Sequence, residues 1–221
     1  MPLRDHFRSP VDNVHAWDEL HGGWPAMIVR QLDEMLPEPW FAAPGVHLGT
    51  LQEVADATTS PLRPTLTLEP QLPGQDVYEV RISDSRRNRR LVAAIEIVSP
   101  SNKDRPETRG MFVSKVAAIL KHDICVSIVD VATTSPFNLY AELMNFLGGT
   151  DPALGDQPPP ISAATLRTRY EGPRRLLDHW YYPLAVGENL PTLPVWLKAD
   201  WAISLDLEAS YEEACRTLRI R

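Results

Sequence analysis

Cysteine is scarce in this chain of 221 residues, and this scarcity excludes two classes of protein. The two cysteines, Cys125 and Cys215, lie far apart in apolar segments, so their spacing predicts neither a zinc site nor a disulfide framework. No apolar run is long enough to span a membrane. The amino-terminal sequence MPLRDHFRSP also lacks the apolar centre of a signal peptide. We therefore expect a cytoplasmic protein without a membrane partner.

The chain also lacks the overall positive charge that is typical of nucleic-acid-binding proteins, since its formal net charge is −7. The charge is unevenly distributed, however. Residues 81–121 hold ten basic and four acidic side chains, a local balance of +6, whereas the rest of the chain holds 12 basic and 25 acidic ones. Such a region suits the phosphates of DNA or RNA, and the alternative is a solvated hairpin tip. The candidate contacts are Arg86, Arg87, Arg89, Arg90 and Arg105.

An apolar fraction of 43% and six tryptophans predict a folded core, and the length fits a single domain. Residues 1–150 have the pattern of an α/β core. Residues 151–221 are predicted to form a Pro-rich connection, a strand at 201–207 and a carboxy-terminal helix at 210–218 that packs on the core. Earlier elements are expected as a helix from Pro25 to Leu36, strands at 46–54 and 65–68, and a short helix at 138–147.

One apolar run, Leu91–Val98, predicts a central strand from Leu91 to Ser99 that is buried on both faces. Glu96 interrupts this run, and an unpaired buried charge costs roughly several kcal/mol. The carboxylate therefore needs a partner such as a metal, a lysine or a proton. Because Pro100 ends the strand, Glu96 lies near its carboxyl end, where α/β sheets bind their ligands.

The segments on either side of this strand place further polar groups near Glu96. Residues 76–83 alternate as a half-buried strand and form an antiparallel hairpin with the central strand across the Arg-rich turn. The register of this hairpin decides whether Asp76 or Glu79 shares a face with Glu96. A helix at 107–121 and a strand at 125–131 complete a βαβ crossover, and Lys115 lies at the edge of the helix's apolar arc.

The segment Glu96-Ile97-Val98-Ser99-Pro100, with Lys115 on the next helix, resembles the PD-(D/E)XK restriction-endonuclease-like superfamily. The similarity is to a branch in which the catalytic lysine has moved from the strand to the following helix; the strand-borne lysine would fall at Val98. Over most of its length the chain is also similar to an uncharacterised bacterial family, domain of unknown function number four thousand and fifty-eight. The segments WDELHGGWP, IEIVSPSNK and LPTLPVWL to LDLE carry that similarity.

This resemblance implies a restriction-endonuclease-like α/β core, in which helices flank a mixed sheet with an antiparallel hairpin and a βαβ crossover, followed by the Pro-rich extension. It also implies Mg²⁺-dependent hydrolysis of phosphodiester bonds. Glu96 with Asp76 or Glu79 would hold the Mg²⁺, because this ion prefers oxygen ligands.

Lys115 would orient the attacking water or stabilise the developing charge, and Lys103 is the alternative residue for that role. Two alternatives stay open. In the first, Glu96 is a structural ion-pair partner of Lys103 or Arg105. In the second, the chain is a catalytically inactive nuclease-fold module that serves in binding or assembly. Among the partners we also consider a second copy of the chain, which would form a homodimer.

Overall fold

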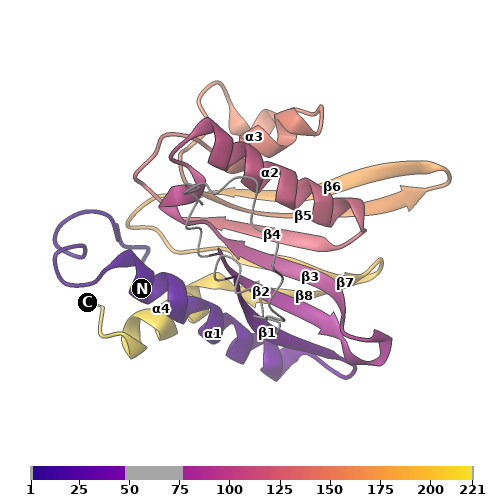
Figure 1. The fold of residues 1–221 in the computed structure, drawn as a ribbon, viewed down its shortest axis with the longest axis horizontal. Coiled ribbons are helices and arrows are strands. Elements are labelled where there is room, and N and C mark those ends of the chain that lie inside the picture. Colours follow the sequence, from indigo (N-terminus) through magenta and orange to yellow (C-terminus); the bar gives the residue numbers. More distant parts are fainter. Residues whose placement is uncertain (1, 48–76, 221) are drawn as a thin grey trace, which may run out of the picture.

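The computed structural model describes residues 2–47 and 77–220 as a mixed α/β fold (Figure 1). Its helices are α1 (Trp17–Met35), α2 (Pro106–Lys121), α3 (Leu139–Phe146) and α4 (Leu207–Thr217). Its strands are β1 (Trp40–His47), β2 (Val77–Asp84), β3 (Arg90–Ile97), β4 (Cys125–Asp130), β5 (Ser162–Glu171), β6 (Arg174–Pro183), β7 (Thr192–Lys198) and β8 (Trp201–Asp206). Short 3-10 turns form at η1 (Ser85–Arg87), η2 (Pro100–Asn102) and η3 (Pro152–Leu154).

The main sheet has six strands in the order β1-β2-β3-β4-β5-β6, and β7 and β8 form a separate two-stranded sheet. The strand β3 is interior, antiparallel to β2 and parallel to β4. This arrangement confirms the predicted hairpin and the predicted βαβ crossover through α2. The remaining neighbours in the main sheet are antiparallel.

The two faces of the sheet pack against different layers, and the alternation of side chains along β3 assigns each residue to one of them. Ala93, Ile95 and Ile97 belong to a core shared with α1, α4 and the β7–β8 hairpin. Val98 belongs to a second core that contains the apolar residues of α2 and α3, which cover the opposite face in Figure 1. Glu96 lies two residues before Val98, and side chains two apart in a strand point to the same face, so the side chain of Glu96 lies on the α2 face.

The carboxy-terminal part of the chain contributes more to the sheet than the sequence predicts. The hairpin β5–β6 extends the main sheet, and neither of its strands was predicted. The terminal helix packs on α1, where Trp24 Nε1 donates to Ser210 Oγ at 3.1 Å and the Trp24 ring contacts Tyr211. This helix starts at Leu207 instead of Ser210, because the side chain of Asp206 caps it by accepting a hydrogen bond from Ala209 N.

The first helix also differs from its prediction, since α1 starts at Trp17 and contains Pro25. Burial of Trp17, Leu20 and Trp24 against the sheet outweighs the low helix propensity of the two glycines between them. Strand β1 spans Trp40–His47, earlier than predicted. Residues 48–54, the strand expected at 65–68 and Asp76 lie outside the described residues. Within the described part of the chain, no helix combines the length and apolar character needed to cross a membrane.

Candidate functional site

Two carboxylates and one ammonium group meet on the α2 face of the sheet. Glu79 of β2 and Glu96 of β3 are direct register partners, so both side chains lie on the same face. From α2, Lys115 Nζ lies 2.8 Å from Glu79 Oε2 and 2.8 Å from Glu96 Oε1. Both carboxylates are buried, at 2% and 1% exposure, while the lysine side chain is 32% exposed. The predicted association of Glu96 with a second acid and Lys115 is therefore present.

Strand β1 provides the space that the Glu79 side chain occupies. Gly45 pairs with Glu79 in the β1–β2 register, and a Cβ at Gly45 would lie 3.0 Å from Glu79 Cγ and 3.2 Å from Glu79 Oε1. A larger residue would therefore push this carboxylate away. Arg81, two residues along β2, also forms an ion pair with Glu79 Oε1. Neither Gly45 nor Arg81 was predicted to belong to the site.

The two carboxylates have opposite pKa shifts. Burial raises the pKa of Glu96 to about 7, and the neighbouring charge of Glu79 adds to this rise while Lys115 opposes it. Burial also acts against ionisation of Glu79. The hydrogen bonds from Glu96 and Lys115, with the charges of Lys115 and Arg81, nevertheless outweigh burial and lower the pKa of Glu79 to about 2. Near neutral pH, Glu79 is thus the fixed anion and Glu96 is the group that exchanges a proton.

The ammonium group of Lys115 stays charged in this environment. Burial alone would lower the pKa of Lys115, but the charge of Glu96 and the hydrogen bonds to Glu79 and Glu96 raise it above the ordinary value. The lysine therefore acts as a cation and not as a base. Of the three groups, only Glu96 is poised to accept a proton near pH 7.

The substitution Glu96→Gln is expected to remove a pH dependence of stability. The folded-state pKa of Glu96 is near 7, above the ordinary 4.5. Glu96 therefore contributes stability that is fully present below pH 4.5 and is lost as the pH rises through 7. The free energy of unfolding of the wild type should therefore fall by about 2 kcal/mol relative to that of Glu96→Gln between pH 5 and pH 8. Chemical denaturation of both proteins at the two pH values measures this difference.

A second variant serves as the control for this measurement. In Glu79→Gln, Glu96 loses the neighbouring charge that raises its pKa, so its titration should move to lower pH. Titration of Asp130, whose pKa burial raises to about 6, affects wild type and both variants alike and cancels in the comparison. A difference between wild type and Glu96→Gln that stays constant from pH 5 to pH 8 would contradict the assignment.

Lys103, the alternative catalytic residue, makes its contacts elsewhere. Its side chain is fully buried, and Nζ lies 3.0 Å from Asp130 Oδ2, 3.0 Å from the Ala132 carbonyl and 2.6 Å from the Pro160 carbonyl. These contacts use the donors of the ammonium group and connect the end of β4 to the loop before β5. Arg105 is exposed at the start of α2. The ion pair expected between Glu96 and Lys103 or Arg105 is therefore formed with Lys115 instead.

The residues present offer two oxygen ligands for a divalent cation. Glu96 Oε1 is buried and lies 2.8 Å from the ammonium group of Lys115, which would have to leave it when a cation binds. It is an oxygen that a metal ion could use, and Glu79 supplies a second carboxylate opposite it. Among the described residues, no three acidic, histidine or cysteine side chains form a metal-binding group. Mg²⁺ tolerates so few protein ligands because it retains several waters.

Comparison with known proteins gives no relative. No family model, no curated protein and no solved structure matches the chain. The resemblance to the PD-(D/E)XK superfamily and to the uncharacterised bacterial family therefore stays a prediction based on sequence motifs.

The basic residues predicted to contact nucleic acid lie on the surface but do not surround the carboxylates. Arg86, Arg87, Arg89 and Arg90 are exposed at the turn between β2 and β3. Two of them pair weakly with acids, Arg86 with Glu38 at 3.7 Å and Arg87 with Asp84 at 3.6 Å. The turn is thus exposed to solvent, which fits both the predicted phosphate contacts and a solvated hairpin tip. Two of its arginines, Arg87 and Arg90, also line a cavity at that end of the sheet.

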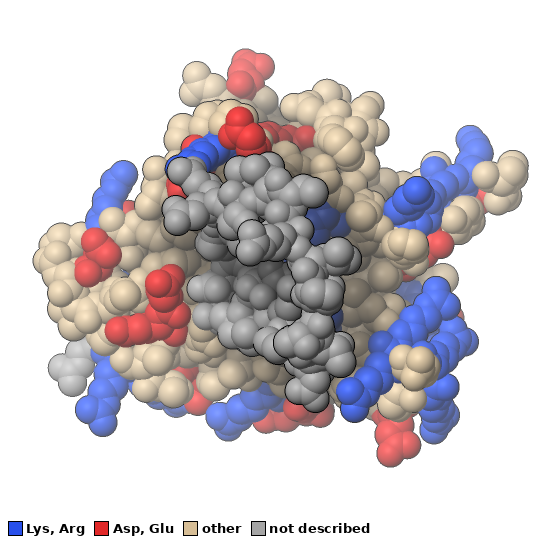
Figure 2. Space-filling model, viewed as in Figure 1, with Lys and Arg blue, Asp and Glu red and all other residues tan. Residues whose placement is uncertain are grey.

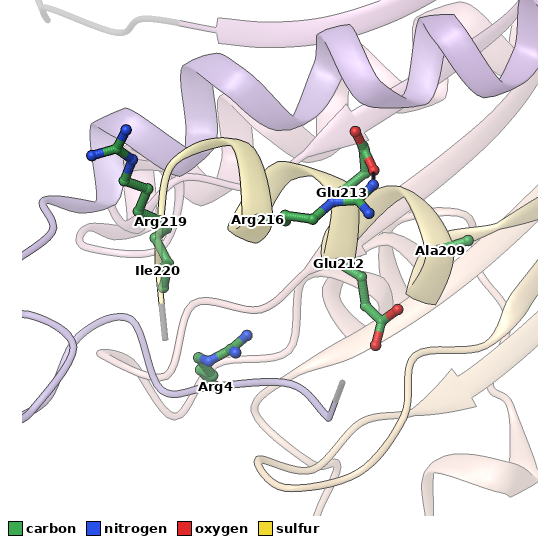
Figure 3. A pocket seen from close by; sticks show the side chains of 7 residues that line it. All are labelled: Arg4, Ala209, Glu212, Glu213, Arg216, Arg219 and Ile220. Atoms are coloured by element: carbon green, nitrogen blue, oxygen red, sulfur yellow. Dashed lines mark ion pairs between the residues drawn. The ribbon is translucent and has the colours of Figure 1, made fainter.

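A cavity of about 840 Å³ lies between the amino-terminal segment and α4 (Figure 3). Its charged lining contains three arginines and two glutamates, and one pair, Glu213 with Arg216, forms an ion pair. Because charges of both signs are mixed there, the cavity has no strong preference for an anion or a cation. None of the residues predicted from the sequence to have a function lies in it.

Proposed function

We propose that the chain is a nuclease-like enzyme that hydrolyses phosphodiester bonds with Mg²⁺. The observation that supports this most strongly is the contact of Lys115 with Glu79 and Glu96, which places two carboxylates and a cation around one point on the sheet. The order of helix, strand, hairpin, helix and strand along the first part of the chain also agrees with the nuclease-like core that the motif implies.

Each residue of the cluster would have a role in hydrolysis that follows from its charge. Glu79 and Glu96 would hold Mg²⁺, which supplies Lewis-acid chemistry at a phosphoryl oxygen when it is bound. Glu96, whose pKa is near 7 in the metal-free cluster, would have to release its proton before the cation binds. Lys115 would stabilise the negative charge that develops on the phosphoryl group. Because Lys115 contacts both carboxylates, its partly exposed side chain must move aside when the cation binds.

The test combines metal binding with cleavage, so that each is measured independently. Isothermal titration calorimetry with Mg²⁺ and Mn²⁺ is expected to show weak binding by the wild type and none by Glu96→Ala. Labelled single-stranded and duplex DNA and RNA should be cleaved by the wild type only when the metal is present. The affinity for metal should rise with pH through 7, because Glu96 must lose its proton before it can bind a cation.

A matched control removes the same charge from the same region. Glu107 is an exposed acid in the first turn of α2, and Glu107→Ala should retain both metal binding and cleavage. Absence of metal binding and of cleavage by the wild type in either metal would contradict the proposal.

The alternative is a catalytically inactive module that keeps the nuclease-like core for binding or assembly. One observation favours it: Lys115 pairs with both carboxylates and Arg81 pairs with Glu79, so two cations offset the two carboxylates without a metal. This alternative predicts that the wild type binds nucleic acid without cleaving it and that Glu96→Ala binds equally well.

A further inference from the structure

A cavity of about 680 Å³ lies at the end of the sheet where β3 and β4 begin and β5 and β7 end. Five cationic side chains and only two acidic ones line it, a balance of +3 in a chain whose net charge is −7. The cations are Arg87, Arg90, Arg167, Arg169 and Lys198, and the acids are Asp84 and Asp123. In Figure 2, Lys and Arg side chains gather at this end of the molecule, on the projecting tips of the β2–β3 and β5–β6 hairpins. We call this cavity the basic groove.

Several cations of the basic groove are accessible to an anion. Arg90 and Lys198 are exposed, and neither forms an ion pair with a described residue. Arg87 is 69% exposed and has one long contact, 3.6 Å to Asp84. By contrast, Arg167 is held by Asp178 and by the carbonyl of Ala199. The groove thus combines fixed charge in its wall with cations that can turn toward a phosphate.

Aromatic rings lie between these cations. The guanidinium of Arg167 lies 3.4 Å from the centroid of the Trp196 ring, and Lys198 Nζ lies 4.8 Å from that of Trp40. Tyr170 also lines the groove and is 58% exposed. The cations already contact the rings of Trp196 and Trp40, so the exposed ring of Tyr170 is the one that offers stacking to a base, and the cations offer pairing to a phosphate.

We propose that the basic groove binds single-stranded nucleic acid, with a base stacked on Tyr170 and backbone phosphates on Arg87, Arg90 and Lys198. A single strand is favoured over a duplex because only unpaired bases can leave their own stack to contact an aromatic ring. This binding needs neither a metal nor Glu96, so it goes beyond the proposed hydrolysis and does not depend on it.

Fluorescence anisotropy with a fluorescein-labelled oligothymidine of 12 nucleotides, in buffer with a chelator, tests the proposal. The double variant Arg90→Glu/Lys198→Glu should bind at least about tenfold more weakly than the wild type. Arg8→Glu/Arg216→Glu is the matched control, because it makes the same change in net charge at exposed positions outside the groove, and it should bind within about twofold of wild type. Equal weakening of both double variants would overturn the proposal.

Substitutions of Tyr170 test stacking without a change in charge. Tyr170→Ala should bind about threefold or more weakly, whereas Tyr170→Phe should retain wild-type affinity. A duplex of the same length should bind more weakly than the single strand, and an oligouridine measured in parallel separates a preference for RNA from one for DNA. The proposal would be refuted if the duplex bound as tightly as the single strand, or if Tyr170→Ala left the affinity unchanged.

Glu96→Gln should bind the oligothymidine as the wild type does. Absence of cleavage by the wild type with single-strand binding intact therefore counts against the hydrolytic proposal only, and absence of single-strand binding by the wild type counts against the groove only.

Discussion

Replacing Lys115 by alanine is expected to lower the rate of metal-dependent phosphodiester cleavage by about a hundredfold or more, which is the usual effect of removing a charge-stabilising group. The structure gives the reason: Lys115 Nζ lies 2.8 Å from an oxygen of each carboxylate, and their charges keep it protonated. Metal binding should persist in Lys115→Ala, because Glu79 and Glu96 remain and no longer contact a competing ammonium group.

Single-turnover rates at saturating Mn²⁺ measure this effect without interference from product release. Lys121→Ala is the matched control, since Lys121 is an exposed lysine on the same helix, and its rate should equal that of the wild type. Lys115→Arg keeps the charge but places it differently, so an intermediate rate is expected. A wild-type rate for Lys115→Ala, with a large loss on substitution of Lys103, would transfer the catalytic role to Lys103.

The sequence was sufficient to predict that Glu96 is buried in an interior strand and that Lys115 reaches it. A single acid in a continuous apolar run must have a partner, and a lysine at the edge of an apolar helical arc can reach over the sheet. Both inferences depend on the local sequence pattern, and in the structure Glu96 is buried and lies 2.8 Å from Lys115 Nζ. The pattern could not decide which acid of the preceding strand faces Glu96.

Which acid of β2 faces Glu96 depends on an irregularity of the β2–β3 hairpin that the sequence motifs do not indicate. If the register of the pairs Asp84↔Arg90 and Ser83↔Leu91 continued along the hairpin, Tyr78 would lie opposite Glu96. A register shift between Ile82 and Ser83 moves the pairing by one residue and places Glu79 there instead. One inserted residue thus changes which side chain shares the site, as expected for a bulge in an antiparallel pair.

The strands β5 and β6 were not predicted, because β5 is held in the sheet by pairing with β4 and β6 and neither strand has a continuous apolar pattern. The first half of β5 is built of small residues, and its second half carries Arg167 and Arg169. Both arginines pair with Asp178 of β6, across the hairpin. Since these partners are distant until the hairpin forms, the basic groove that β5 borders could not be inferred from the sequence.

The substitution Lys103→Met is expected to reduce the free energy of unfolding by about 3–5 kcal/mol, because it leaves the carboxylate of Asp130 buried without its cation. Asp130 is buried at 1% exposure, and it receives the ammonium group of Lys103 and the amide of Ala132. Burial raises the pKa of Asp130 to about 6 even with the lysine present. Loss of the lysine should raise this pKa further, so protonation relieves part of the cost and the loss should be larger at pH 8 than at pH 5.

Urea denaturation of Lys103→Met, Asp130→Asn and the double variant Lys103→Met/Asp130→Asn distinguishes an ion pair from simple loss of packing. In the double variant no buried charge remains, and the asparagine oxygen can still accept the amide of Ala132, so most of the stability should return. If the losses of the two single variants simply add, Lys103 and Asp130 are not coupled. If Lys103→Met instead retains full stability but loses cleavage, its buried ammonium group belongs to the active site and Lys115 has the structural role.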